Sequence, residues 1–203
     1  GGFEVSDTAL VGPDWGDYRV VSLVDLDGDG NQDVLGAYDL FISLWEHAWG
    51  LVAFPGDGDG GFGEGVMLWG ASGVPPSRLL AGDLDEDGDL DLLTDRLLMN
   101  QGDLAFEPHG ACCTPGGIRS GLIDHDGDGA LDLVGVTVGS SQLTWARNNF
   151  DARSTTFEHH MTAETLHPPD FVFAVDMDGD GDQDVVIHDS WGNLLVFAND
   201  GAG

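Results

Sequence analysis

The stretch Asp25-Leu-Asp-Gly-Asp-Gly-Asn-Gln-Asp33 decides the fold of this chain, because its pattern returns three more times. The other copies are Asp83-Leu-Asp-Glu-Asp-Gly-Asp-Leu-Asp91, Asp124-His-Asp-Gly-Asp-Gly-Ala-Leu-Asp132 and Asp176-Met-Asp-Gly-Asp-Gly-Asp-Gln-Asp184. Every copy has Asp at positions 1, 3, 5 and 9 and Gly at position 6, whereas positions 2, 4, 7 and 8 vary. The chain of 203 residues therefore contains four repeated units.

Each acidic loop lies between two short apolar runs. The runs before the loops cover residues 19–24, 78–82, 117–123 and 171–175. The runs after the loops begin with residues 34–35, 92–93, 133–134 and 185–186. Their lengths and their Gly, Asp or Pro boundaries predict strands rather than helices. Each unit is therefore expected to be a strand, an acidic loop and a second strand.

A second element follows each loop. It consists of an apolar stretch, a turn rich in Gly, Asn or Asp, and then Phe, and it covers residues 51–62, 98–106 and, in a more divergent form, 143–157. Such turn residues between strand-like runs predict hairpins. The fourth copy begins at residue 194 and is cut off by the chain end, and residues 1–5 supply the missing part.

Repeated units of four strands predict an all-β fold, a β-propeller of about four blades with DxDxDGxxD calcium loops. We expect residues 1–203 to form a single domain, because the length favours one. The N-terminal segment would complete the last blade, in its own chain or in a neighbour. A four-bladed ring, a larger ring or fibre made of several chains, and a piece of a longer array all remain open.

The spacing of the aspartates predicts a Ca²⁺ site in each loop, about four in all. Ca²⁺ is a hard cation that takes six to eight oxygen ligands. Alternating Asp residues turn three carboxylates inward, Gly at position 6 permits a positive φ, position 7 supplies a backbone carbonyl and position 9 closes the site. The predicted ligands are Asp25, Asp27, Asp29, Asn31, Asp33, Asp83, Asp85, Asp87, Asp89, Asp91, Asp124, Asp126, Asp128, Ala130, Asp132, Asp176, Asp178, Asp180, Asp182 and Asp184.

The loops are not EF-hands, which need Glu at position 12 and flanking helices. DxDxDGxxD between strands, followed by a Gly-rich turn and Phe, resembles the FG-GAP/VCBS repeat. That family of calcium-loop β-propellers includes the head domain of integrin α subunits and some fungal lectins. The resemblance covers nearly the whole chain, although the family often builds seven blades. It implies calcium as a structural ion that fixes adjacent strands, while other loops bind sugars or proteins.

The charge of the chain excludes several classes of partner. It has 37 acidic residues against 6 basic ones, a formal net charge of −31. Nucleic-acid binding and attraction to anionic membranes both need clustered Lys and Arg, so neither is expected. No apolar run approaches the length of about 20 residues that membrane insertion requires. Four Ca²⁺ ions would neutralise part of the negative charge and stabilise the folded state.

The remaining candidate residues give weaker patterns. The acidic cluster at residues 57–64 lacks the register and is expected to be a plain hairpin turn. Cys112 and Cys113 are adjacent, and a strained disulfide, inter-chain bridges or two free thiols remain open. No His pattern is typical of zinc, and His125 is expected to face solvent. Residues 158–170 are expected to form a surface loop. The six Trp residues fit either packing between blades or, where exposed, sugar stacking.

These patterns predict a calcium-stabilised, non-enzymatic binding or adhesion module that recognises a glycan or a protein. We expect it in the extracellular space or at the cell surface, where weak calcium loops are filled. One alternative is a self-assembling structural subunit of an oligomer or filament, formed by exchange of the terminal blade. Another is a carbohydrate-active enzyme or its accessory domain, although no nucleophile motif supports catalysis and no catalytic residue is predicted.

Overall fold

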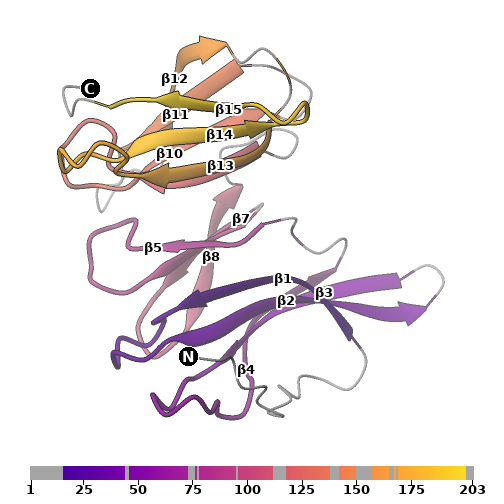
Figure 1. Ribbon diagram of the computed structural model, residues 1–203. Helices are drawn as coiled ribbons and strands as arrows, with labels where there is room; N and C mark the ends of the chain where they lie inside the picture. Colours follow the sequence, from indigo (N-terminus) through magenta and orange to yellow (C-terminus); the bar gives the residue numbers. More distant parts are fainter. Residues whose placement is uncertain are drawn as a thin grey trace, which may run out of the picture.

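The structure is a computed structural model that describes residues 16–43, 46–72, 76, 78–94, 96–111, 118–137, 142–149, 157–164, 167 and 169–199. Within these residues the protein is all-β, with fifteen strands in four antiparallel sheets and no helix. No described segment is a helix long and apolar enough to span a bilayer. Figure 1 shows the sheets following one another along the chain. The expected all-β class is confirmed.

The first two sheets each contain four strands in chain order. The first sheet consists of β1 (Gly16–Val24), β2 (Asp33–Ser43), β3 (Glu46–Phe54) and β4 (Val66–Ser72). The second sheet consists of β5 (Leu80–Gly82), β6 (Asp91–Leu93), β7 (Arg96–Asn100) and β8 (Phe106–Ala111). Each strand pairs with the next one in the sequence, so each sheet is a meander like one blade of a propeller.

The third sheet repeats this arrangement and the fourth has one strand fewer. The third sheet consists of β9 (Ile118–Ile123), β10 (Asp132–Thr137), β11 (Gln142–Asn148) and β12 (Phe157–Glu164). The fourth sheet consists of β13 (Pro169–Val175), β14 (Asp184–Asp189) and β15 (Leu194–Phe197). The expected completion of this sheet by residues 1–5 lies outside the described residues.

Strands flank every acidic loop, as the sequence predicts. The loops at residues 25–33, 83–91, 124–132 and 176–184 join β1 to β2, β5 to β6, β9 to β10 and β13 to β14. Figure 1 shows the turns that follow β1, β5 and β13 along the same side of the molecule, at the left. The predicted hairpins are also present, since β3 pairs with β4, β7 with β8 and β11 with β12.

The expected surface loop at residues 158–170 is wrong. Most of this segment belongs to β12, which pairs with β11 from Asn148 opposite Phe157 to Gln142 opposite Glu164. The sequence of β12 lacks a regular alternation of apolar and polar residues, so periodicity does not reveal it. It is an edge strand, and its conformation is set by the hydrogen bonds that β11 offers.

Three apolar clusters join each sheet to the next. Each cluster takes side chains from the facing surfaces of two consecutive sheets. Representative members are Leu35, Leu51 and Leu92 for the first and second sheets, Leu93, Leu97 and Leu133 for the second and third, and Ile123, Val134 and Ile187 for the third and fourth. The core is therefore a series of layers between consecutive sheets rather than a single centre.

The series of sheets is open among the described residues. No buried cluster of described side chains joins the fourth sheet to the first. A fourth cluster, with Tyr38, Val52 and Phe54, lies on the face of the first sheet that points away from the second. The sheets resemble propeller blades in topology and order, while closure into a ring stays a prediction.

Candidate metal centres

Each acidic loop reverses direction through two residues with positive φ. Position 6 has this conformation in all four loops, as the sequence predicts: Gly30, Gly88, Gly129 and Gly181, with φ between 91° and 102°. Position 4 has it as well, in Gly28, Glu86, Gly127 and Gly179. Glycine adopts this conformation without steric cost, which explains why it occupies seven of the eight positions. Sequence reasoning treated position 4 as free, although three of its four residues are Gly.

Hydrogen bonds within the loops fix the carboxylates at positions 1 and 5. The carboxylate at position 1 accepts from the backbone N–H at position 6, at 2.9 Å between Asp25 and Gly30 and at 3.1 Å between Asp83 and Gly88. The same bond recurs in the third and fourth loops. The carboxylate at position 5 accepts from the N–H at position 7 in every loop. These backbone donors therefore hold the carboxylates at positions 1 and 5 in place within each loop.

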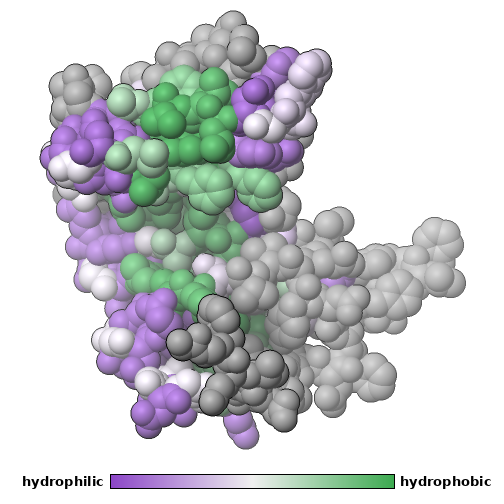
Figure 2. Space-filling model, viewed as in Figure 1, coloured by the Kyte–Doolittle hydropathy of each residue, from purple (hydrophilic) through white to green (hydrophobic). Residues whose placement is uncertain are grey.

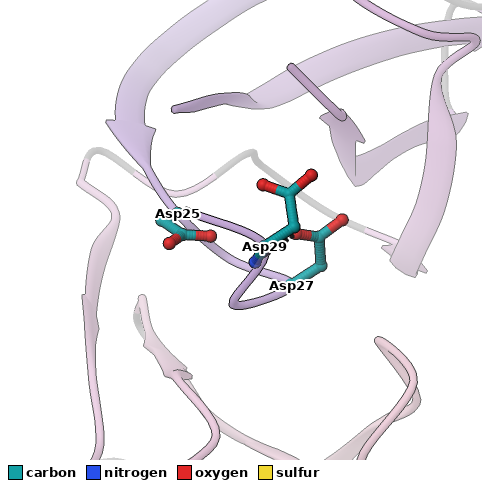
Figure 3. Close-up of side chains that lie close together, drawn as sticks. All are labelled: Asp25, Asp27 and Asp29. Atoms are coloured by element: carbon teal, nitrogen blue, oxygen red, sulfur yellow. Dashed lines mark hydrogen bonds between the residues drawn. The ribbon is translucent and has the colours of Figure 1, made fainter. Parts of the chain in front are cut away.

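Three carboxylates meet in every loop, with oxygen atoms within 4.8 Å of one another. Figure 3 shows the first group, in which Asp27 and Asp29 lie side by side and Asp25 lies across the turn. Like charges at this distance repel one another unless a cation lies between them. The groups are Asp25, Asp27 and Asp29; Asp83, Asp85 and Asp91; Asp124, Asp126 and Asp128; and Asp176, Asp178 and Asp184.

The donors in these groups fit a hard divalent cation. Asp25 Oδ1 and Asp126 Oδ1 are buried and accept no hydrogen bond. A buried carboxylate oxygen without a donor is costly, so both atoms are suited to ion coordination. All side-chain donors in the four groups are carboxylate oxygens, which calcium prefers, and none is a thiolate or imidazole that would favour zinc.

The carboxylate at position 9 has a structural role in all four loops. Asp33 accepts from the N–H of Leu26 with one oxygen and from the N–H of Gly56 with the other, both at 2.8 Å. Each equivalent Asp likewise joins the second residue of its loop to the end of the third strand of its sheet: Asp91, Asp132 and Asp184. All four side chains are buried. Position 9 therefore couples the loop to the following hairpin.

The structure brings only some of the predicted carboxylate ligands together in each loop. Asp91 and Asp184 lie in the groups of three in their loops, whereas Asp33 and Asp132 do not. In the second and fourth loops the carboxylate at position 9 takes the place of the one at position 5, so Asp87 and Asp180 are outside the groups. The carbonyl oxygens at position 7 stay predicted ligands: Asn31, Asp89, Ala130 and Asp182.

Burial and mutual repulsion raise the pKa of several of these carboxyl groups. Burial raises the pKa of Asp91 and of Asp132 from 3.8 to about 6, although backbone N–H donors oppose the shift. Burial also raises the pKa of Asp27 and of Asp85, and neighbouring carboxylates raise it further. In the absence of an ion, these loops therefore hold negative charge at a cost in free energy.

The third loop differs because it contains a basic partner. The Nη2 atom of Arg147, on β11, lies 3.0 Å from Asp126 Oδ2 and 2.7 Å from Asp128 Oδ2. This hydrogen bond holds the pKa of Asp128 below its ordinary value. The guanidinium thus supplies positive charge where a metal ion would otherwise do so. Among the described residues, no ion pair joins a side-chain cation to any of the other three loops.

Sequence reasoning missed three buried Asn residues that lie at the end of the third strand of their sheets or just after it. Asn100 Nδ2 donates to the carbonyl of Leu90 within the second sheet. Asn148 Nδ2 donates to Leu84 O at 2.8 Å, which joins the third sheet to the second loop. Asn199 Nδ2 donates to His125 O in the third loop in the same way. The recurrence of Asn at this place in three of the four units was the signal available in the sequence.

A family model described as FG-GAP-like repeat matches residues 25–94 and 124–187, which is more than half of the chain. The chain belongs to the FG-GAP-like repeat family. Such repeats indicate a binding or adhesion-type module, often bind Ca²⁺, are typically extracellular or at the cell surface and are generally non-enzymatic. No curated protein and no solved structure matches the chain.

The other candidate residues of this FG-GAP-like chain have varied outcomes. The cluster at Asp57 is a hairpin turn, with Asp59 N–H and Gly61 N–H both donating to Asp57 Oδ1. Cys112 and Cys113 lie outside the described residues. His125 was expected to face solvent, and this expectation is wrong because the side chain is half-buried. Its ring centroid lies 4.5 Å from that of Trp145, and burial lowers its pKa.

The described Trp side chains divide between core and surface. Trp49 is buried in the cluster between the first and second sheets, and Trp69 packs against the same cluster. Trp191 lies in the turn between β14 and β15 and is 75% exposed. Its ring stacks on that of His167, with centroids 4.2 Å apart. The expectation of packing between sheets therefore holds for the first two residues, and Trp191 presents an aromatic surface to solvent.

Proposed function

We propose that this FG-GAP-like repeat chain is a calcium-stabilised extracellular or cell-surface module that binds a glycan or a protein and catalyses no reaction. In this proposal residues 1–203 act as one domain. The observation that carries it is the link from each acidic loop through its position-9 carboxylate to the third strand of the sheet. An ion held by the loop would order two strands and a hairpin together.

The ion would be held by the three carboxylates that meet in each loop, from positions 1, 3 and 5 in the first and third loops and from positions 1, 3 and 9 in the second and fourth. The backbone carbonyl at position 7 would be a further ligand. Bound calcium would supply the positive charge that these side chains lack. Because the loops take this form only in the folded chain, ion binding adds directly to the free energy of unfolding. Calcium in this role is structural, and recognition falls to other surfaces of the same fold.

Calcium titration of the metal-free chain tests this role. Isothermal titration calorimetry is expected to show about four ions. The many oxygen ligands of each loop are expected to prefer Ca²⁺ over the smaller Mg²⁺, which keeps more of its water. The variant D27N/D29N is expected to lose the ion of the first loop. The variant D59N/D103N removes two negative charges at exposed positions outside the loops and is the matched control. Absence of calcium binding, or equal binding by D27N/D29N and D59N/D103N, would contradict the proposal.

A glycan as the ligand is favoured by Trp191, because its exposed indole stacked on His167 offers a flat apolar face next to polar groups. Asp189 fixes this turn by accepting from the N–H groups of Trp191 and Asn193. Glycan-array binding in calcium is expected to fall for W191A and to persist for S190A, a change at the exposed neighbour. Equal binding by both variants would contradict the assignment of Trp191.

A further inference from the structure

A line of hydrogen bonds joins the second, third and fourth acidic loops. It passes through the residues at positions 2 and 9 of a loop and through the Asn at the end of the third strand of the following sheet, or just after it. From the second loop to the fourth its members are Asp91, Leu84, Asn148, Asp132, His125, Asn199 and Asp184. The first and last members belong to the carboxylate groups of the second and fourth loops.

The link between the second and third loops consists of three bonds. The N–H of Leu84 donates to Asp91 Oδ2 at 2.9 Å, and the carbonyl of Leu84 accepts from Asn148 Nδ2 at 2.8 Å. The N–H of Asn148 donates to Asp132 Oδ1 at 2.7 Å. One Asn residue therefore holds the position-2 carbonyl of one loop and the position-9 carboxylate of the next.

The link between the third and fourth loops has the same form. The N–H of His125 donates to Asp132 Oδ2 at 3.2 Å, and the carbonyl of His125 accepts from Asn199 Nδ2 at 3.3 Å. The N–H of Asn199 donates to Asp184 Oδ1 at 2.8 Å. Because Asp132 takes part in both links, the third loop lies in the middle of the line.

The line is buried although the loops reach the surface. Figure 2 shows hydrophilic side chains along the left edge of the molecule, where Figure 1 has the turns that follow β1, β5 and β13. The Asp and Asn residues of the line are at most 8% exposed, and Leu84 is 1% exposed. A buried donor or acceptor that loses its partner is costly. Displacement of one member therefore disfavours the folded position of its neighbours.

The first loop lies outside this line. Asn148 Nδ2 donates to Leu131 O in its own loop as well as to the loop before it. Among the described residues, Asn100 Nδ2 donates to the equivalent Leu90 O and not to the first loop. Leu26, at position 2 of the first loop, packs in the apolar cluster between the first and second sheets. Apolar packing is not directional, so it transmits a displacement less strictly than a hydrogen bond does.

We propose that Asn148 and Asn199 are positioning residues that couple calcium binding in the second, third and fourth loops, while the first loop binds its ion independently. This inference rests on the proposed calcium sites and adds an interaction between them. Without an ion, the carboxylates of a loop repel one another and displace its position-2 residue. That displacement breaks the bond to the Asn of the next sheet. Filling one loop therefore strengthens calcium binding in its neighbour, by about fivefold or more.

Two-dimensional NMR of the full chain measures each loop separately during a Ca²⁺ titration. The N–H of the position-6 glycine donates to the position-1 carboxylate, so its chemical shift reports the ion in its own loop: Gly30, Gly88, Gly129 and Gly181. D83A removes the position-1 carboxylate of the second loop, and D25A removes that of the first. The two variants are matched, because each silences one site and only the second loop belongs to the line.

The third loop is where the coupling is measured. D83A is expected to weaken calcium binding there by at least about fivefold. D25A is expected to change it by less than about twofold. In the N148A background, D83A is expected to have no larger effect than D25A, because the link is missing. D176A, which silences the fourth loop, is expected still to weaken the third loop in that background, whereas a general loss of stability would affect both couplings.

Two further variants control for folding and for position. N149A, at the exposed adjacent residue, keeps the link and is expected to behave like the wild type. Circular dichroism in calcium checks that N148A folds. If N148A does not fold, the other link provides the same test, and N199A is expected to abolish the effect of D176A on the third loop.

Two results would overturn the coupling. One is an equal effect of D83A and D25A on the third loop, and the other is a full effect of D83A in the folded N148A chain. Four ions that bind without influencing one another would leave the proposed calcium sites intact and overturn this inference alone. A chain that binds no calcium would overturn both.

Discussion

Arg147 makes the third acidic loop different from the other three at the level of single side chains. Its guanidinium contacts Asp126 and Asp128, two of the three carboxylates that meet there. A metal ion that enters this loop competes with a cation that is already attached to the chain. The loops are therefore expected to fill unequally, with the third one last.

Replacing Arg147 by Met is expected to raise the calcium affinity of the third loop by about three- to tenfold, because the carboxylates lose their internal counter-charge. Isothermal titration calorimetry of R147M against the wild type measures the change. R96M removes a cation from an exposed position on β7 and is the control for net charge. An identical affinity of R147M and R96M would show that the guanidinium does not compete with the ion.

The side chain of Asn148 shows which residue-level features a single sequence conceals. Its amide donates to Leu84 O, 64 residues earlier, and Asn199 donates to His125 O, 74 residues earlier. Such donors and acceptors meet only after two sheets have packed, so local patterns do not predict them. The Asp and Gly spacing of the loops is predictable because the hydrogen bonds from position 6 to position 1 and from position 7 to position 5 lie within nine residues.

Replacing Asn148 by Ala is expected to lower the free energy of unfolding by about 2 kcal/mol, because the buried carbonyl of Leu84 and the partly buried carbonyl of Leu131 lose their donor. Urea unfolding in excess calcium measures this change. N149A, at the exposed adjacent position, is expected to differ from the wild type by less than about 0.5 kcal/mol. Equal midpoints for the two variants would contradict a role of Asn148 in joining the sheets.

At the scale of elements, each loop and hairpin form one unit through a buried carboxylate. Asp91 joins Leu84 N–H to Asn100 N–H, and Asp132 joins His125 N–H to Asn148 N–H. The strands beside the loops were predictable because each loop and its two flanking strands are adjacent in the sequence. β12 was not, because its pairing with β11 rather than its own apolar pattern defines it.

The raised pKa values of Asp91 and Asp132 predict how the metal-free chain responds to pH. The folded state binds protons at these carboxyls with a pKa of about 6, against an ordinary value of 3.8. The folded state therefore holds more protons between about pH 4 and 6, and the free energy of unfolding falls as pH rises through that window. Urea midpoints in metal-depleted buffers check this, and a midpoint that increases from pH 4 to 6 would contradict it.

At the scale of the whole molecule, four sheets packed in series depend on four loops of one kind. Ions that bind the folded state at about 100 times their dissociation constants each add about 2.7 kcal/mol. Four ions together add about 11 kcal/mol, so chelation is expected to lower the melting temperature by roughly 20–40 °C, given about 2–4 °C per kcal/mol for a chain of this size. Differential scanning calorimetry with and without excess chelator measures this, and an unchanged melt would contradict a structural role for calcium.

The sheet series was predictable from the four repeats, and its ends were not. The strand runs and hairpins give four blade-like units, but no local pattern states whether the outer faces of the first and fourth sheets meet within the chain. That depends on the rotation between sheets, which packing determines. The exposure of Leu23 and Phe173 is information that only the folded chain contains.

Among the described residues, the fourth sheet has three strands and packs against one other sheet, whereas the second and third sheets each pack against two. Opening β13–β15 breaks a single interlayer contact, while opening an inner sheet breaks two. In a deuterium-exchange time course on the isolated chain, the amides of β14 should therefore be labelled before those of β6 and β10. Loss of order would then begin at the C-terminal end and proceed inward, one layer after another.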